Sequence, residues 1–185
     1  MRFGYATLGL VLFRVLWGFC GNRYARFRAF LTSPLTALKS FPNLFDKAPD
    51  RYTGHSPYAG YAVLLLLYFA GAQAISGLFI SDDILYSGPY NPVISNDLAG
   101  TLAWYHHTNF TLFQVMITGH LLTILWYRFR KGESLTLPML TGKKPSGTDA
   151  GKVSAIRAIV VIVLCLLTIT ALIQLAPEPS FDDYY

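Results

Sequence analysis

Charged residues are scarce in this chain, at 14% of its 185 positions, whereas hydrophobic residues make up 53%. A soluble domain of this size carries about 25% charged residues. The shortage of charge therefore excludes an ordinary soluble protein and indicates an integral membrane protein.

Cysteines are also few. Cys20 and Cys165 are the only two, and both lie in or at apolar stretches. They provide no disulfide framework and no metal-type spacing, so we interpret them as small residues facing lipid or core. The sequence also lacks a glycine-rich phosphate loop, a Ser/His/Asp set and a carboxylate pair within a span. Nothing therefore favours a hydrolase or a transferase.

Four apolar stretches are candidates for membrane spans: Tyr5–Cys20, Tyr58–Ile80, Leu102–Tyr127 and Ser154–Leu175. The last contains 18 consecutive uncharged residues, 158–175, close to the length that a spanning helix needs. The first is short and carries Arg14, so a signal peptide is the alternative. Arg14 interrupts its apolar core and no small-x-small cleavage site follows, which favours a retained helix. The prediction is an all-α membrane protein with four transmembrane helices in one up-down bundle, residues 1–185 forming a single domain.

The charges indicate a topology. Lysine and arginine concentrate in the segments 21–56 and 128–152, whereas the segment 81–101 and the C-terminal tail carry only acidic charges. By the positive-inside rule the two basic segments are cytoplasmic, which places both termini outside. This topology accounts for the net charge of +5, so the charge does not indicate a nucleic-acid partner. In the first basic segment we expect Phe27, Phe30, Leu31 and Leu35 to dip toward lipid.

Two histidines share one long apolar segment. His106 and His120 are fourteen residues apart, about 40° short of four full helical turns, so both project from nearly the same stripe. They lie about 21 Å apart along the axis, one in each leaflet of a bilayer about 30 Å thick. This is a suitable geometry for two stacked haems, since imidazole nitrogen is a good axial ligand for haem iron. The alternative is that the histidines hydrogen-bond to neighbouring helices.

Three more residues are candidates for supporting roles. His107 falls off the stripe and is expected to be a supporting or interfacial residue. His55 precedes the second span at its cytoplasmic end, where it could reach the depth of His120 or simply face water. Arg14 could snorkel to the interface or pair with a haem propionate.

These residues lie within stretches that resemble the bacterial cytochrome b561 family, which includes the b-type cytochrome subunits of nickel-iron hydrogenases. The similarity covers residues 3–144, and the span from 154 to 175 is additional. The stretches that carry it are GYATLGLVLFRVLWGFCGNRYARF from Gly4, GHSPYAGYAVLLLL from Gly54, SGLFISDDILYSGP from Ser76, and His106 through HLLTILWYRFRKGESLTLPMLTGKK.

The resemblance implies a four-helix bundle with two haems b, each held by two histidines, and electron transfer between a partner redox protein and the quinone pool. The family's axial ligands match His106 and His120. Their partners come from the family's first helix and from the start of its second. The family's second helix corresponds to Tyr5–Cys20 here, and the histidine expected four residues before Gly4 falls just before Met1; the family's first helix is absent. Three explanations compete: the first helix is missing from this sequence, a partner subunit supplies the histidines, or the chain has lost one or both haems and become a scaffold. His55 opposite His120 could rescue one site.

The favoured hypothesis is a b-type cytochrome of the bacterial inner membrane, an electron-transfer subunit rather than a stand-alone enzyme. It would hold one or two haems b through His120 and His106, with other membrane or periplasmic redox subunits as partners. A quinone would approach near Arg14 and His55. The alternative is a haem-poor structural or assembly subunit of a larger membrane redox complex.

Overall fold

The computed structural model describes residues 1–46, 56–81, 87–132, 136 and 154–177. Over these residues the fold is helical and contains no strand, apart from one isolated β-bridge between Ser81 and Ser87. Its elements, in chain order, are α1 (Arg2–Cys20), α2 (Phe27–Phe30), α3 (Pro34–Ser40), the 3-10 turn η1 (Phe41–Leu44), α4 (Pro57–Ser76), the 3-10 turn η2 (Asn91–Val93), α5 (Asn96–Arg130) and α7 (Ala155–Gln174). Helices α1, α4, α5 and α7 are each long and apolar enough to cross a membrane. The predicted class, an all-α protein with four spans, is confirmed.

Local sequence signals start these helices. Ser95 and Ser154 each accept a hydrogen bond from the backbone N–H three residues on, at the starts of α5 and α7, and Pro57 occupies the first turn of α4. These are the residue types that satisfy or tolerate the free N–H groups of a helix start. Helix α5 is longer than its apolar stretch. Its 35 residues extend about 52 Å, which exceeds the thickness of the hydrocarbon of a bilayer.

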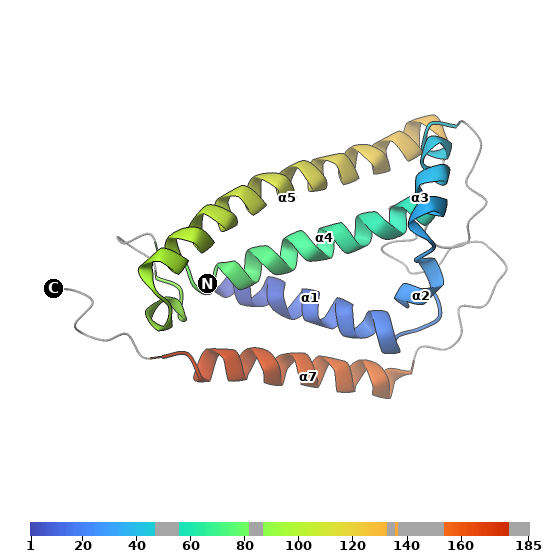
Figure 1. Cartoon of the computed structure of the whole chain (residues 1–185). Helices are drawn as coiled ribbons and strands as arrows, with labels where there is room; N and C mark the ends of the chain where they lie inside the picture. The colour runs from blue at the N-terminus through green and yellow to red at the C-terminus, as the bar shows by residue number, and fades with distance from the viewer. Residues whose placement is uncertain (47–55, 82–86, 133–135, 137–153, 178–185) are drawn as a thin grey trace.

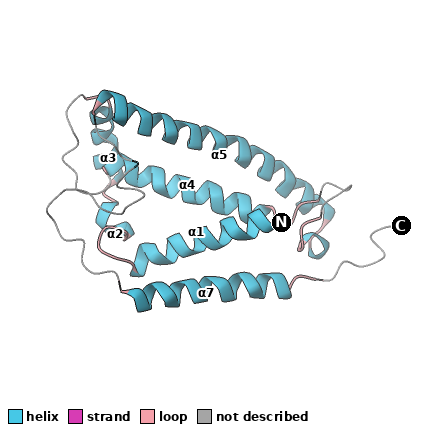
Figure 2. Ribbon diagram, turned by 180° about the vertical axis from the view of Figure 1, so that it is seen from behind, coloured by secondary structure: helices cyan, strands magenta, loops and turns pink. Residues whose placement is uncertain are grey.

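The four long helices lie side by side in the order α5, α4, α1, α7, and each runs opposite to its neighbour (Figure 1). The view from behind shows the same order, with α5 and α7 at the two edges (Figure 2). Neighbouring helices meet at small residues: a Cβ on Gly71 of α4 would lie 3.4 Å from Val11 of α1, and one on Gly9 of α1 would lie 3.6 Å from Ile169 of α7. Both are ordinary contact distances, so an alanine at either position would fit without separating the helices.

The segment that joins α1 to α4 crosses one end of the row (Figure 1). The Tyr61 hydroxyl of α4 donates to Thr32 O over 2.8 Å, and the Trp126 indole of α5 donates to Leu44 O over 3.0 Å. Phe30 is only 5% exposed and packs on α4, where a Cβ on Gly60 would lie 2.9 Å from the Phe30 ring. The prediction that Phe30 faces lipid is therefore wrong, because the ring fills the space that glycine leaves on α4.

Candidate haem-binding site

His106 and His120 both lie on the side of α5 that turns toward α4. The buried or half-buried positions of α5 recur at helical spacing along this side, at Tyr105, His106, Asn109, Phe113, Met116, His120, Thr123 and Tyr127. Hydroxyl pairs mark the same side, Tyr105 with Tyr68 over 2.9 Å and Tyr127 with Tyr58. The stripe that carries the two histidines is thus the packing face of α5.

Both ring nitrogens of His106 are hydrogen-bonded to α4. Nε2 lies 2.7 Å from Gln73 Nε2, and Nδ1 lies 2.9 Å from Ser76 Oγ. Ser76 is 3% exposed, and the ring edge also rests on the last turn of α4, with Cε1 only 3.3 Å from a Cβ position on Gly77. The imidazole is therefore fixed in orientation by the end of α4.

The hydrogen bonds around His106 specify which ring nitrogen carries the proton. Asn109 Nδ2 donates to Phe69 O over 3.0 Å and to Gln73 Oε1 over 2.7 Å, so the other end of the Gln73 amide must donate to His106 Nε2. Ser76 Oγ donates to Ala72 O over 2.6 Å, so it accepts from Nδ1–H. The hydrogen bonds with Gln73 and with Ser76 therefore agree: the proton of the His106 ring is on Nδ1 and the lone pair is on Nε2.

This tautomer suits a metal ligand, because a ligating histidine donates its other ring N–H to a fixed acceptor. Ser76 provides that acceptor. The lone pair on Nε2 accepts from the amide of Gln73, a half-buried side chain. His106 therefore has the tautomer of an axial ligand, and its Nε2 would bind iron only in place of the Gln73 amide.

Asn109 is the most buried polar residue of the cluster, at 2% exposed. Its Nδ2 makes both bonds described above, whereas its Oδ1 is buried and has no hydrogen-bond partner among the described residues. An amide in this position holds Gln73, and Gln73 holds His106.

His120 has a different environment. Its ring is half-buried, and no group in the described part of the chain hydrogen-bonds to it. The neighbouring Gly119 has open space where a Cβ would lie, with nothing within 4 Å. A half-buried imidazole with free nitrogens beside an open position fits a ligand for a flat macrocycle.

Arg14 turns toward the segment that follows α1. One guanidinium nitrogen donates to Ala25 O over 3.3 Å, and the group lies 5.2 Å from the centre of the Phe27 ring and 5.9 Å from that of Phe30. These contacts agree with the interpretation that Arg14 snorkels to the membrane boundary. They leave its proposed pairing with a haem propionate as a prediction.

The remaining histidines contribute less. His107 is exposed, and its ring meets that of His106 edge-on at 6.0 Å, so it lies off the stripe as predicted. His55 lies outside the described residues. The three histidines that the structure describes are all on α5, so the described parts of α1, α4 and α7 contain no histidine that could pair with His106 or His120.

Sequence reasoning missed Gln73 and Ser76. Both are polar residues at the end of an apolar span, three positions apart and hence on one face of α4. Polar groups inside a membrane are functional candidates by default, and applying that rule to the second span as well as the third would have found them.

The chain was compared with known families, curated proteins and solved structures. The family model described as prokaryotic cytochrome b561 matches residues 1–142 of the 185, nearly the range over which the resemblance is expected. No curated protein and no solved structure gives a significant match. With four helices able to span a membrane and two histidines on one face of the third, this chain belongs to the prokaryotic cytochrome b561 family.

Proposed function

We propose that the chain is the membrane-embedded b-type cytochrome subunit of a respiratory complex and relays electrons between a partner redox protein and the quinone pool. Family membership supports a membrane b-type cytochrome in electron transfer. The observation that carries the proposal further is the placement of His106 and His120 on the packing face of one helix, about 21 Å apart along its axis. Two redox centres at these depths would carry an electron across most of the bilayer.

Each residue has a defined task in this proposal. His120 and His106 hold the iron of haem b, and Ser76 fixes the His106 ring by accepting its Nδ1 proton. Haem supplies a one-electron couple when bound, and two imidazole ligands saturate the iron, which suits electron transfer rather than oxygen chemistry. The second ligands would come from His55 on the side of His120, or from histidines of a partner subunit. Arg14 is the proposed partner of a propionate, and a quinone would approach near Arg14 and His55.

The proposed topology follows from the charges. The ends of α1 and α5 and the starts of α4 and α7 meet at one side of the row (Figure 1), where the arginines of α2 and of the α5 end lie. By the positive-inside rule this side faces the cytoplasm of a bacterial inner membrane and both termini face outward. The single domain then includes α7, which lies beyond the family match.

A difference absorption spectrum tests the proposal. The chain purified from haem-replete cells should give a b-type α-band on reduction, and His120→Ala and His106→Ala should each reduce the haem content. His107→Ala is the matched control, since it removes an exposed imidazole next to His106 and should retain all the haem. Colourless protein, or full haem content in both ligand variants, would refute the assignment.

A haem-poor structural subunit is the second candidate. The observation that favours it is that both nitrogens of His106 already have protein partners on α4, as they would in a purely structural contact. The same spectrum separates the two, because a structural subunit would show no α-band although its helices form.

A further inference from the structure

A pocket lined by arginine lies directly after the end of α1. It encloses about 490 Å³ and is lined by Arg23, Arg26, Arg28 and Ala29. Arg26 is half-buried and its Nε donates to Gly21 O over 2.8 Å, which fixes one wall. Arg23 and Arg28 are exposed, so their guanidinium groups can adjust to a ligand.

Carboxylates are scarce among the described residues around this pocket. The first 45 residues of the chain contain no aspartate or glutamate. Among the described residues only Asp46 and Asp97 carry carboxylate side chains, and Asp97 lies in the first turn of α5, at the opposite end of the row (Figure 1). Three arginines that share one pocket repel each other unless an anion binds between them.

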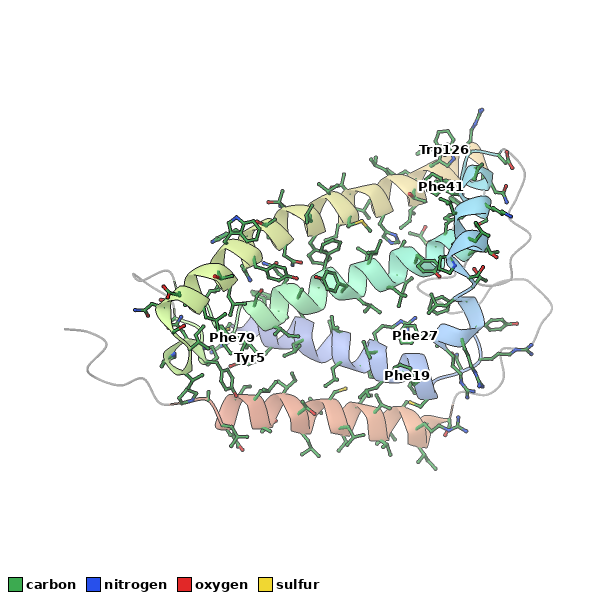
Figure 3. All side chains as sticks on the ribbon, viewed as in Figure 1. Tyr5, Phe19, Phe27, Phe41, Phe79 and Trp126 are labelled. Carbon is green, nitrogen blue, oxygen red and sulfur yellow. The ribbon has the colours of Figure 1, made fainter. Side chains whose placement is uncertain are left out.

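The depth of the pocket matches the headgroup region of a bilayer. The 19 residues of α1 extend about 28 Å, which is close to the thickness of the hydrocarbon. Residues that follow Cys20 therefore lie at the level of lipid phosphates. Phe19, in the last turn of α1, is 72% exposed and meets Phe27 edge-on at 5.3 Å, and Figure 3 shows the two rings at this end of the helix. The site thus combines a cationic pocket with an apolar flank.

Contacts between α1 and the residues next to the pocket hold α2 against α1. Arg14 donates to Ala25 O and lies over the rings of Phe27 and Phe30. The Phe27 ring fills the space beside Gly18, where a Cβ would overlap it. The backbone that carries Arg26 and Arg28 is therefore tied to α1.

We propose that this pocket binds the headgroup of one anionic phospholipid, with the phosphate between Arg23, Arg26 and Arg28 and an acyl chain along Phe19. Guanidinium groups match phosphate oxygens in pairs, and basic pockets on the cytoplasmic side of membrane proteins hold acidic headgroups. The residues that would contact the lipid, Phe19, Arg23, Arg26 and Arg28, include none of those assigned to haem or quinone.

Native mass spectrometry of the full chain in detergent, titrated with dioleoylphosphatidylglycerol, tests the proposal. Each arginine near the surface contributes about 1 kcal/mol, a factor of about five, so Arg23→Gln/Arg26→Gln/Arg28→Gln should weaken binding about a hundredfold. The matched control, Arg128→Gln/Arg130→Gln/Arg157→Gln, removes the same charge from the same side and should weaken it less than about fivefold. The zwitterionic lipid dioleoylphosphatidylcholine should bind the wild-type protein and the Arg23→Gln/Arg26→Gln/Arg28→Gln variant equally weakly.

Three results would overturn the proposal: equal weakening in both triple variants, equal binding of the zwitterionic lipid, or displacement of the lipid by millimolar inorganic phosphate, which would indicate a site for free anions. If the triple variant fails to fold, Arg28→Gln against Arg128→Gln decides, with about a fivefold difference expected. Haem content is measured in the same samples and should not change.

Discussion

Replacing Gln73 by leucine should separate the stability of the α4–α5 contact from its ability to hold haem. Gln73 accepts from Asn109 and donates to His106 Nε2, both over 2.7 Å. Leucine keeps a similar volume and removes both bonds. In the haem-free protein the variant therefore loses two interhelical hydrogen bonds and leaves the lone pair of His106 without a donor.

The expected cost follows from hydrogen bonds measured between membrane helices, which contribute about 0.6 kcal/mol on average and about 1.7 kcal/mol at most. Two of them give a loss of about 1 to 3 kcal/mol in the free energy of unfolding of the haem-free protein. Binding of iron at His106 should change in the opposite direction, because the variant no longer has to displace the Gln73 donor. If the hydrogen bond from Gln73 to His106 contributes about 0.6 kcal/mol, its removal should make haem binding to the variant about threefold tighter than to the wild type.

Two measurements on protein from haem-deficient cells check these values: unfolding in mixed micelles with increasing dodecyl sulfate, and titration with haem followed by absorption. The control is Gln114→Leu, which removes an exposed amide from α5 and should leave both quantities unchanged. Unchanged stability in Gln73→Leu would show that the hydrogen bonds do not hold the helices together. Weaker haem binding would show that Gln73 supports the ligand instead of competing with iron.

Two further predictions concern the same helix pair and its neighbours. Ser76→Ala removes the acceptor of the His106 Nδ1 proton and should weaken haem binding at that site about 10- to 100-fold, measured by the same titration; unchanged affinity would contradict the assigned tautomer. Gly60→Ala places a Cβ 2.9 Å from the Phe30 carbonyl oxygen and should lower stability by about 1 to 3 kcal/mol, whereas Gly71→Ala meets only an ordinary contact at 3.4 Å and should be neutral or stabilising by up to about 1 kcal/mol. Thermal unfolding in detergent compares the two alanine variants, and equal effects would refute the difference in packing.

The ends of the helices were harder to predict than their existence. Hydropathy suggested that the second span reaches Ile80, but α4 ends at Ser76, because the backbone beyond it bonds to the following loop: Tyr90 N–H donates to Leu78 O, and Gly88 N–H to Ile80 O. Helix α5 extends to Asn96 and Arg130, well past its apolar centre, since polar residues continue a helix in water and leave no hydropathy signal.

The candidate site divides in the same way. The fourteen-residue spacing alone indicates that His106 and His120 share a stripe, because helical periodicity is a local property. The partners Gln73 and Ser76 lie 33 and 30 residues away in the sequence. Which residues of α4 face His106 depends on the register between the two helices, and no local pattern specifies that register.

The sequence by itself indicated four spans, two basic segments that predict their orientation, and two histidines on one stripe of a helix, because helix length, hydropathy and periodicity depend on neighbouring residues. Only the tertiary structure decided that the histidine stripe packs on α4, that Ser76 and Gln73 assign the proton of His106, and that three arginines after α1 surround one pocket. The physical reason is that side-chain hydrogen bonds and pockets form between segments far apart in the chain, so they follow from how the helices pack.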